Sequence, residues 1–220
     1  TISVMNDFGA KIIRTGRHHY LVGTQQIYAG RDYYVEGDAS SASYFFLAAA
    51  LLKKTIRVNG INRFSAQGDI RLLDIIEQLG CRVEGGSDYV EVTGRDLAAG
   101  ELTLDLGDMP DMVPTVGVLA AFREGRTKII NVAHLRIKES NRLAAMVSEL
   151  NRIGIKASEL PDGLMIEGGS PHGADIETYN DHRIAMSFAV AGLVTPGIEI
   201  RDKKCVDKSF PEFWGLWETL

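Results

Sequence analysis

The chain has few cysteines, few prolines and no long apolar run. Of its 220 residues, 2 are cysteine and 6 are proline. Cys81 and Cys205 lack the spacing of a metal motif, and two thiols without a disulfide framework fit a reducing cytoplasm, although a bridge between them stays open. No stretch reaches the roughly 18 apolar residues that cross a bilayer, and the first residues lack the features of a signal peptide. The sequence therefore predicts a cytoplasmic protein with no membrane partner.

An excess of positive charge is also missing. The 24 Lys and Arg residues are outnumbered by 29 Asp and Glu residues, which gives a formal charge of −5. Nothing in this balance favours nucleic acid as a partner, and no stripe of basic and aromatic residues appears. Any attraction for anions must therefore be local.

The composition is that of a globular protein, 45% hydrophobic and 24% charged. A chain of this length forms one large domain or two small ones. Because no linker-like segment divides it, we expect a single domain over residues 1–220. Residues 1–9 read as the end of a helix that stops at Gly9, and the chain starts without methionine, so we expect a portion of a longer protein.

One pattern of helix end, glycine and strand recurs three times. The glycines are Gly9, Gly80 and Gly154, at intervals of 71 and 74 residues. Each is followed by a turn and a second strand-like run. Self-similarity at a nearly fixed interval is typical of a structural repeat.

An aspartate also opens an almost uniformly apolar stretch in each repeat. The aspartates are Asp38, Asp111 and Asp181, and the apolar stretches cover residues 39–52, 112–122 and 184–193. Stretches that are apolar all round predict helices buried on every side, and Asp is a favoured N-cap. A strand-like run and an amphipathic helix follow each time, the helices over residues 69–79, 140–153 and 209–220. Residues 209–212 read as a capping box for the last of them.

The repeating unit is therefore βαβαββ, present about three times with the first and last copies cut. It predicts an α/β (α+β) fold of the inverse kind, with sheets outside and parallel buried helices within. Parallel equivalent helices would gather their N-termini at one end of the domain. Helix N-termini carry partial positive charge and free N–H groups, which suits a phosphate or carboxylate ligand.

Basic residues stand at several of these expected helix starts, where they are unfavourable unless an anion offsets them. They are Lys138, Arg142, Arg183 and Lys208. If Glu139 or Ser140 opens the second amphipathic helix, Glu139 and Arg142 lie on one face. A lone K-E-x-x-R is more often an exposed, charged first turn, so this motif needs support from the rest of the chain.

Asp111 and Glu139 are the candidate acid–base pair. By the logic of the repeat, Asp111 alone is more simply an N-cap, as Asp38 and Asp181 are expected to be. Glu139 alone could serve only to interact with the partial positive charge at a helix N-terminus. His182 is as consistent with a structural hydrogen bond as with a place in the pocket.

Three motifs in order resemble the C-terminal half of the 5-enolpyruvylshikimate-3-phosphate synthase family. They are N-V-A-H-L-R-I-K-E-S-N-R at residues 131–142, Y-N-D-H-R at 179–183 and D-K-S-F-P at 207–211. V-E-G-D-A-S-S-A-S-Y-F at 35–45 and S-A-Q-G-D-I-R at 65–71 are also similar, as scaffold. The resemblance covers nearly the whole chain and implies an enolpyruvyl-transferase domain.

The resemblance implies a role for each candidate residue. Asp111, in the family's M-P-D, would hold and deprotonate the 5-hydroxyl of shikimate 3-phosphate, and Lys138 would contact the same substrate. Arg142, Arg183 and Lys208 would bind the carboxylate and phosphate of phosphoenolpyruvate. Glu139 would shuttle the proton at the methylene carbon. Neither a metal nor an organic cofactor is implied.

The resemblance also implies an incomplete site. The family's phosphate-binding Lys-Ser and Ser-Ser-Gln elements belong to the N-terminal half, which would be the partner of this chain. The serines of residues 40–43 are expected only to pack inside a helix. His134 stands where some family members carry an asparagine that contacts shikimate phosphate. Two alternatives stay open, a transferase acting on a UDP-amino sugar and an anion-binding domain without turnover.

Overall fold

The computed structural model describes all residues, Thr1–Leu220, as two compact units, Thr1–Val35 and Glu36–Leu220. The single domain predicted over residues 1–220 stays a prediction. No helix is long and apolar enough to cross a membrane. Cys81 and Cys205 are both buried and unbridged.

The N-terminal unit consists of one helix and one hairpin. Helix α1 (Ile2–Asp7) ends ahead of Gly9, whose φ of +91° is the left-handed conformation that favours glycine. Strands β1 (Ile12–Arg14) and β2 (Tyr20–Val22) then pair antiparallel. The predicted order of helix end, glycine and two strands is confirmed here, and no residue of α1 is buried.

The larger unit contains one complete βαβαββ copy. Its elements are β6 (Leu102–Asp105), α4 (Val113–Ala121), β7 (Gly125–Ile130), α5 (Arg142–Arg152), β8 (Lys156–Leu160) and β9 (Gly163–Gly168). They form the sheet β6-β7-β9-β8, in which β6 and β7 are parallel and the other pairs antiparallel. A helix joins the parallel pair, as such a connection requires.

The two other copies are partial, as predicted. The first contributes α2 (Ala39–Leu52), β3 (Thr55–Asn59), α3 (Leu72–Gln78), β4 (Arg82–Gly85) and β5 (Tyr89–Thr93), and the last contributes β10 (Ala174–Ile176), α6 (His182–Gly192), β11 (Ile198–Ile200) and α7 (Phe213–Trp217). The sheet β3-β5-β4 repeats the order of β7-β9-β8, and the parallel pair β10-β11 repeats β6-β7.

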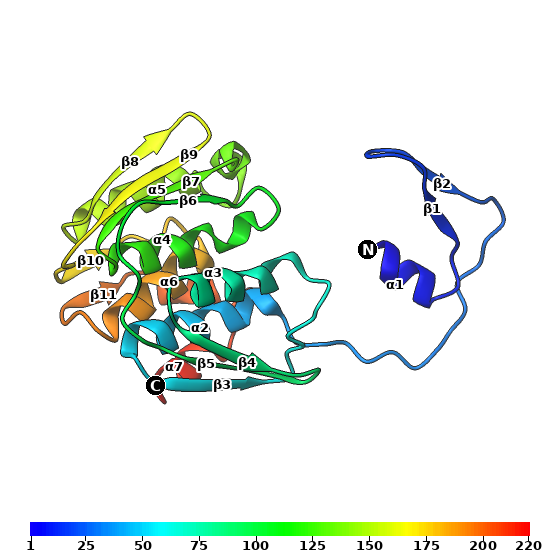
Figure 1. Cartoon of the computed structure of the whole chain (residues 1–220), viewed down its shortest axis with the longest axis horizontal. Coiled ribbons are helices and arrows are strands. Elements are labelled where there is room, and N and C mark those ends of the chain that lie inside the picture. Colours follow the sequence, from blue (N-terminus) through cyan, green and yellow to red (C-terminus); the bar gives the residue numbers. More distant parts are fainter. The chain divides into compact units, whose positions relative to one another are not determined.

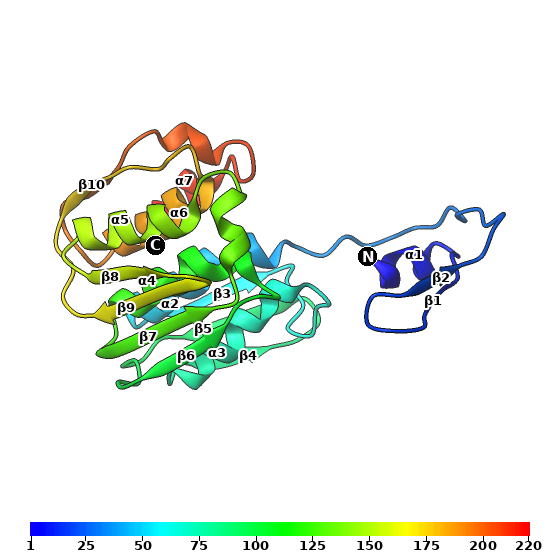
Figure 2. The same cartoon turned by 90° about the horizontal axis from the view of Figure 1, so that it is seen from above.

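Helices α2, α4 and α6 contact one another and lie between the sheets (Figures 1 and 2). Every residue of α4 is buried, which explains why its sequence is apolar on all faces. The N-terminal halves of α2 and α4 meet, because Ser43 Oγ of α2 lies 3.2 Å from Thr115 Oγ1 of α4. The predicted inverse arrangement of buried helices under sheets is confirmed.

Several predicted helix starts are wrong in detail. Asp38 and Asp181 cap α2 and α6, but Asp111 lies inside a 3-10 helix (Pro110–Met112) that precedes α4 and caps nothing. Neither Glu139 nor Ser140 opens α5, because Asn141 is its N-cap and accepts from the N–H of Ala144 at 3.3 Å.

The capping box at residues 209–212 does not form. Helix α7 begins only at Phe213, because the chain still turns through residues 206–210, where the N–H of Phe210 donates to the carbonyl of Val206. The hydroxyl of Ser209 also donates to that carbonyl, at 3.4 Å, and the N-cap residue of α7 is Glu212, without a side-chain cap hydrogen bond.

Candidate active site

The guanidinium of Arg142 is the centre of the candidate site. Arg142 is the first residue of α5, and its side chain is 1% exposed. Its Nε donates to Asp181 Oδ2 at 2.7 Å, Nη1 to Asp111 Oδ1 at 2.8 Å and Nη2 to Glu139 Oε2 at 2.7 Å. One buried cation thus joins three carboxylates from three segments of the chain.

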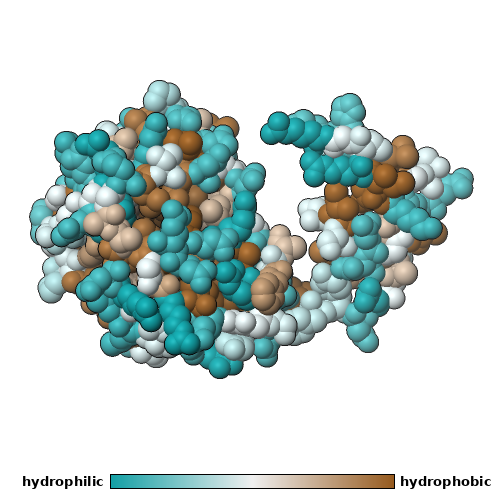
Figure 3. Space-filling model, viewed as in Figure 1, coloured by the Kyte–Doolittle hydropathy of each residue, from teal (hydrophilic) through white to brown (hydrophobic).

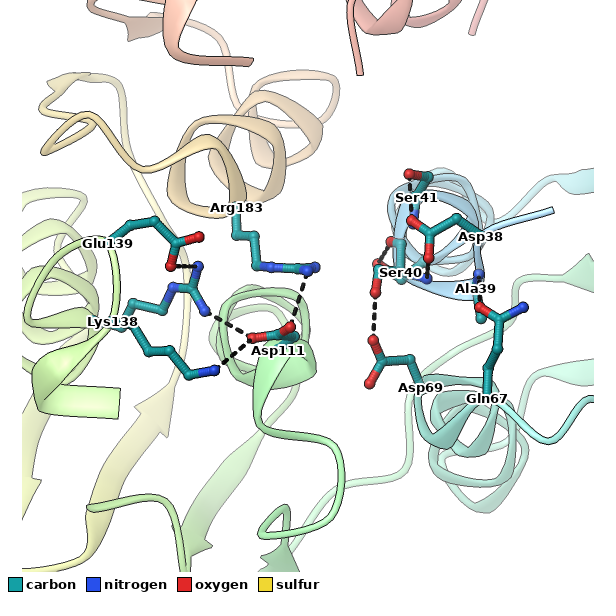
Figure 4. Close-up of polar contacts among 12 residues, drawn as sticks. Asp38, Ala39, Ser40, Ser41, Gln67, Asp69, Asp111, Lys138, Glu139 and Arg183 are labelled. Carbon is teal, nitrogen blue, oxygen red and sulfur yellow. Dashed lines mark hydrogen bonds and ion pairs between the residues drawn. The ribbon is translucent and has the colours of Figure 1, made fainter. Parts of the chain in front are cut away.

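Asp111 is held by cations on two sides. Its second carboxylate oxygen accepts from Nη2 of Arg183 at 3.0 Å, and Nζ of Lys138 lies 4.0 Å from the first. Figure 4 shows Asp111, Lys138 and Arg183 pointing toward one another from different elements. The 3-10 turn at Pro110 is what turns the Asp111 side chain toward this cluster rather than toward the N–H groups of α4.

Glu139 lies on the other side of Arg142. Besides its hydrogen bond to Arg142, it has Nζ of Lys208 at 3.9 Å from Oε1. The side chains of Glu139 and Asp111 are 35% and 29% exposed, so both carboxylates border the buried guanidinium and reach solvent. The predicted pairing of Glu139 with Arg142 is present although Glu139 precedes the helix.

The structure brings all six predicted site residues together. They come from the 3-10 helix before α4, the segment that leads into α5 and its first residue, α6, and the segment before α7: Asp111, Lys138, Glu139, Arg142, Arg183 and Lys208. Lys138, Lys208 and Arg183 are at least partly exposed and are placed to meet an anion, whereas Arg142 is covered. No group of His, Cys, Asp and Glu side chains is suited to hold a metal ion.

Sequence reasoning missed one member of the cluster. Asp181 was expected only to cap a helix, yet it also binds Arg142 and accepts from Ser140 Oγ at 3.0 Å. The signal that could have revealed it is its place two residues before Arg183 in Y-N-D-H-R. His134, in contrast, lies exposed in the 3-10 helix Ala133–Ile137.

The serines at the start of α2 do more than pack. Ser40 Oγ donates to Asp69, and Ser41 Oγ donates to Asp38 at 2.7 Å (Figure 4). Burial raises the pKa of Asp69, although the hydroxyl of Ser40 opposes this shift. The expectation of simple packing is therefore wrong for both serines, because they lie in the first turn, where acidic side chains surround the helix end.

His182 is buried beside the cluster, with Nδ1 lacking a hydrogen-bond partner. Burial, the positive charge of Arg183 and, more weakly, that of Lys208 lower the pKa of His182 from 6.5, against the carboxylates of Asp181 and Glu139. The imidazole is therefore neutral at pH 7.

We expect His182 to make the chain less stable as the pH falls below 6.5. The unfolded chain then binds a proton that the folded chain resists, so the free energy of unfolding decreases. Urea unfolding between pH 8 and 5 would measure this decrease, and His182→Gln should reduce it. His134→Gln, at an exposed site, is the control and should keep the wild-type slope. An unchanged slope in His182→Gln would contradict the assignment.

Two features define the class of protein: βαβαββ repeats with buried helices, and basic side chains gathered with carboxylates at the helix starts. A solved structure titled EPSP synthase from Acinetobacter baumannii has the same fold, with a TM-score of 0.83 and 29% identity over 100% of this chain and 53% of that chain. The fold is that of an enolpyruvyl transferase, as the sequence predicts.

Two sequence relatives carry the name 3-phosphoshikimate 1-carboxyvinyltransferase. The protein of Syntrophobacter fumaroxidans is 47% identical over 226 residues, which cover 100% of this chain and 52% of the relative. That of Nostoc punctiforme is 44% identical over 214 residues, or 97% of this chain and 50% of the relative. A sequence model of the family described as EPSP synthase (3-phosphoshikimate 1-carboxyvinyltransferase) matches residues 1–217. The chain belongs to this family and spans about half the length of the curated relatives it matches.

Proposed function

We propose that this chain is one half of an enzyme that transfers the enolpyruvyl group of phosphoenolpyruvate to the 5-hydroxyl of shikimate 3-phosphate, releasing phosphate. The reaction belongs to the synthesis of aromatic amino acids, and we place the enzyme in the cytoplasm. The observation that carries the proposal is that one guanidinium, Arg142, holds both Asp111 and Glu139 at hydrogen-bond distance. Two carboxylates so placed can serve the proton transfers that the reaction needs.

The first step is an addition. The 5-hydroxyl oxygen bonds to C2 of phosphoenolpyruvate, while Asp111 takes the hydroxyl proton and Glu139 gives a proton to the methylene carbon. This forms a tetrahedral intermediate with a methyl group. In the second step the C2–O bond to phosphate breaks, the leaving phosphate takes up the proton held by Asp111, and Glu139 removes a proton from the methyl group to restore the double bond. Both steps balance without a cofactor.

The cations supply binding and charge stabilisation. Arg183 and Lys208, which solvent reaches, bind the carboxylate and phosphate of phosphoenolpyruvate, Lys138 contacts shikimate 3-phosphate, and Arg142 contributes its positive charge to the same anions from its buried position. Each η nitrogen of a guanidinium carries two N–H groups, so Arg183 Nη2 can hold Asp111 and still donate to a ligand. Preorganised cations of this kind stabilise charge that develops on phosphate as it leaves.

The partner in this proposal is the N-terminal half of the same enzyme. Ten of the 14 exposed large apolar side chains lie within residues 1–35, and the apolar patch of the N-terminal unit is visible in Figure 3. In the larger unit, strands β5 and β9 each pair on both edges, whereas β2 pairs with β1 alone. An apolar helix and a strand from the other half would complete this copy of the repeat, since large exposed apolar patches mark interaction sites.

The proposed reaction is tested by phosphate release from the complete two-half enzyme. Phosphoenolpyruvate with shikimate 3-phosphate should release phosphate, and phosphoenolpyruvate with a UDP-amino sugar should not. Release with the amino sugar and none with shikimate 3-phosphate would replace this proposal by the related transferase. Release with neither acceptor would favour an anion-binding domain without turnover.

Changing Arg183 to Lys in the complete enzyme should weaken phosphoenolpyruvate binding on the order of tenfold, or about 1.4 kcal/mol. The charge remains, but the planar fork that grips a carboxylate or phosphate in two places is lost. Calorimetric titration with phosphoenolpyruvate would measure the change. Arg201→Lys is the matched control, because Arg201 is exposed and pairs with Asp175 on the β10-β11 sheet. Equal affinities in the two variants would count against a binding role for Arg183.

A further inference from the structure

Asp181 is the one carboxylate of the cluster that solvent does not reach. Its side chain is 0% exposed and has four donors around it. Oδ2 accepts from Arg142 Nε at 2.7 Å and from Ser140 Oγ at 3.0 Å. Oδ1 accepts from the backbone N–H of Arg183 at 3.0 Å and faces Arg142 Nη2 at 3.4 Å. Because it is covered, Asp181 is placed to act on the site through Arg142 rather than on a substrate.

The turn that presents Asp181 is tied to the helix that carries Arg142. Tyr179 and Asn180 both adopt left-handed backbone conformations, with φ of +54° and +55°. A tyrosine holds such a conformation only when its surroundings enforce it, whereas asparagine adopts it more readily. Here the hydroxyl of Tyr179 donates to Glu149 Oε1 at 2.7 Å, and Glu149 is a buried residue of α5. The same helix therefore anchors both partners of the Asp181–Arg142 pair.

Capping alone does not require this ion pair. Asp38 also caps its helix, accepting from the N–H groups of Ser40 at 3.3 Å and Ser41 at 2.8 Å, whereas Asp181 accepts from one helix N–H, that of Arg183. Asp38 forms no ion pair with any Lys or Arg. The contact with a guanidinium is thus an addition found at α6, where the helix start borders the site, and Asp38, which is exposed, serves as a capping aspartate without an ion pair.

The charges favour the pair strongly. Burial by itself would raise the pKa of Asp181, yet the hydrogen bond and charge of Arg142 outweigh it and hold that pKa below its ordinary value. Burial likewise opposes the charged form of Arg142. Three carboxylates outweigh it and raise the pKa of Arg142, and Asp181 contributes most among them. A buried ion pair that loses one member leaves an uncompensated charge, which then seeks another partner.

We propose that Asp181 is a positioning residue that orients the Arg142 guanidinium, so that its two η nitrogens hold Asp111 and Glu139 at a fixed separation. The inference rests on the proposed function for its effect on turnover, and on the geometry alone for its effect on Arg142. Neutralising Asp181 frees Nε, and the guanidinium turns toward the remaining carboxylates. The proton-transfer groups then lose their common support.

The first test compares Asp181→Asn with Asp38→Asn in the complete two-half enzyme. Asparagine is as good an N-cap as aspartate, so each variant keeps one capping oxygen, while it loses the charge and exchanges the second acceptor oxygen for an N–H donor group. We expect kcat to fall about tenfold in Asp181→Asn, with KM for shikimate 3-phosphate within about twofold of wild type. Asp38→Asn should keep kcat within about twofold. Equal losses in the two variants would overturn the proposal and indicate a general effect of capping.

A double-mutant cycle separates positioning from plain stability. If Asp181 acts through Arg142, adding Asp181→Asn to Arg142→Lys should change kcat by less than about twofold beyond Arg142→Lys alone. If the two substitutions lower kcat by factors that multiply in the double variant, Asp181 acts independently of Arg142. Should Asp181→Asn fail to fold, Ser140→Ala removes only one hydrogen bond to Asp181 and should lower kcat about threefold with the same dependence on Arg142.

The second test does not depend on catalysis. In the 220-residue chain, the ¹⁵N-labelled Nε–H of Arg142, identified by its absence in Arg142→Lys, should exchange slowly with solvent because Asp181 accepts it. Slow exchange should persist in Asp38→Asn and become at least about tenfold faster in Asp181→Asn. Unchanged exchange in Asp181→Asn would refute the positioning role even if the enzyme is active. If the complete wild-type enzyme has no turnover, the proposed function fails while this test still decides the geometry.

Discussion

The 220-residue chain alone is expected to release no phosphate above background from shikimate 3-phosphate and phosphoenolpyruvate. It carries Asp111, Glu139 and four cations, but the chain spans about half of its relatives' length. Oriented substrates behave as if present at effective molarities of about 10⁵–10⁸ M. This advantage vanishes when half of the residues that surround the substrates are absent. Water would also enter beside the exposed faces of both carboxylates and weaken every charge interaction.

Adding the separately made N-terminal half should restore measurable phosphate release. The same mixture with Glu139→Gln in this chain is the control, because the partner half is then present and one acid–base group is missing. Turnover by the lone chain, purified free of the host enzyme, would refute the two-half hypothesis and mean that these residues form a sufficient site. A mixture that forms a complex without turnover would instead point to the non-catalytic alternative.

Replacing Glu139 by Gln in the complete enzyme should lower kcat by a factor on the order of 10²–10⁴ with little change in either KM. Glutamine keeps the size and can still accept from Arg142 Nη2, which lies 2.7 Å from Oε2. It cannot deliver or take up the proton at the methylene carbon. The change therefore isolates proton transfer from the geometry of the cluster.

Steady-state phosphate release with each substrate varied would measure both constants. Glu167→Gln is the matched control, because Glu167 also faces two cations, Lys156 at 3.0 Å and Arg126 at 3.3 Å, but on the outer sheet. A kcat near the wild-type value in Glu139→Gln would exclude Glu139 as acid or base. A rise in KM without loss of kcat would reassign it to substrate binding.

Local sequence rules predicted the repeat because each of its signals is local. The glycine after each amphipathic helix adopts a positive φ, with values of +91° at Gly9, +101° at Gly80 and +84° at Gly154. No other residue takes that conformation so readily, so glycine marks the same helix end each time. The all-apolar stretch of α4 likewise required burial on every side, and every one of its residues is buried.

The exact helix starts were not predictable in this way. Asp111 follows the spacing of Asp38 and Asp181, but Pro110 opens a short 3-10 helix and the carboxylate turns to Arg142 and Arg183 instead of to backbone N–H groups. Two guanidinium donors from distant segments outcompete a local cap here. Pro211 similarly suggested a helix start that the turn at Val206 displaces.

The sequence by itself determined the secondary-structure repeat, the class of fold and the residue types of the site, because periodicity, glycine placement and the K-E-S-N-R and Y-N-D-H-R motifs depend on neighbours in the chain. Only the tertiary structure decided that Arg142 is covered and bound by three carboxylates, and that Asp181 is its buried partner 39 residues away. Charge pairing across such a separation depends on how helices pack against one another. That packing is fixed by the burial of their apolar faces. The hydrophobic effect is non-directional, so it does not depend on the polar groups that meet at the helix ends.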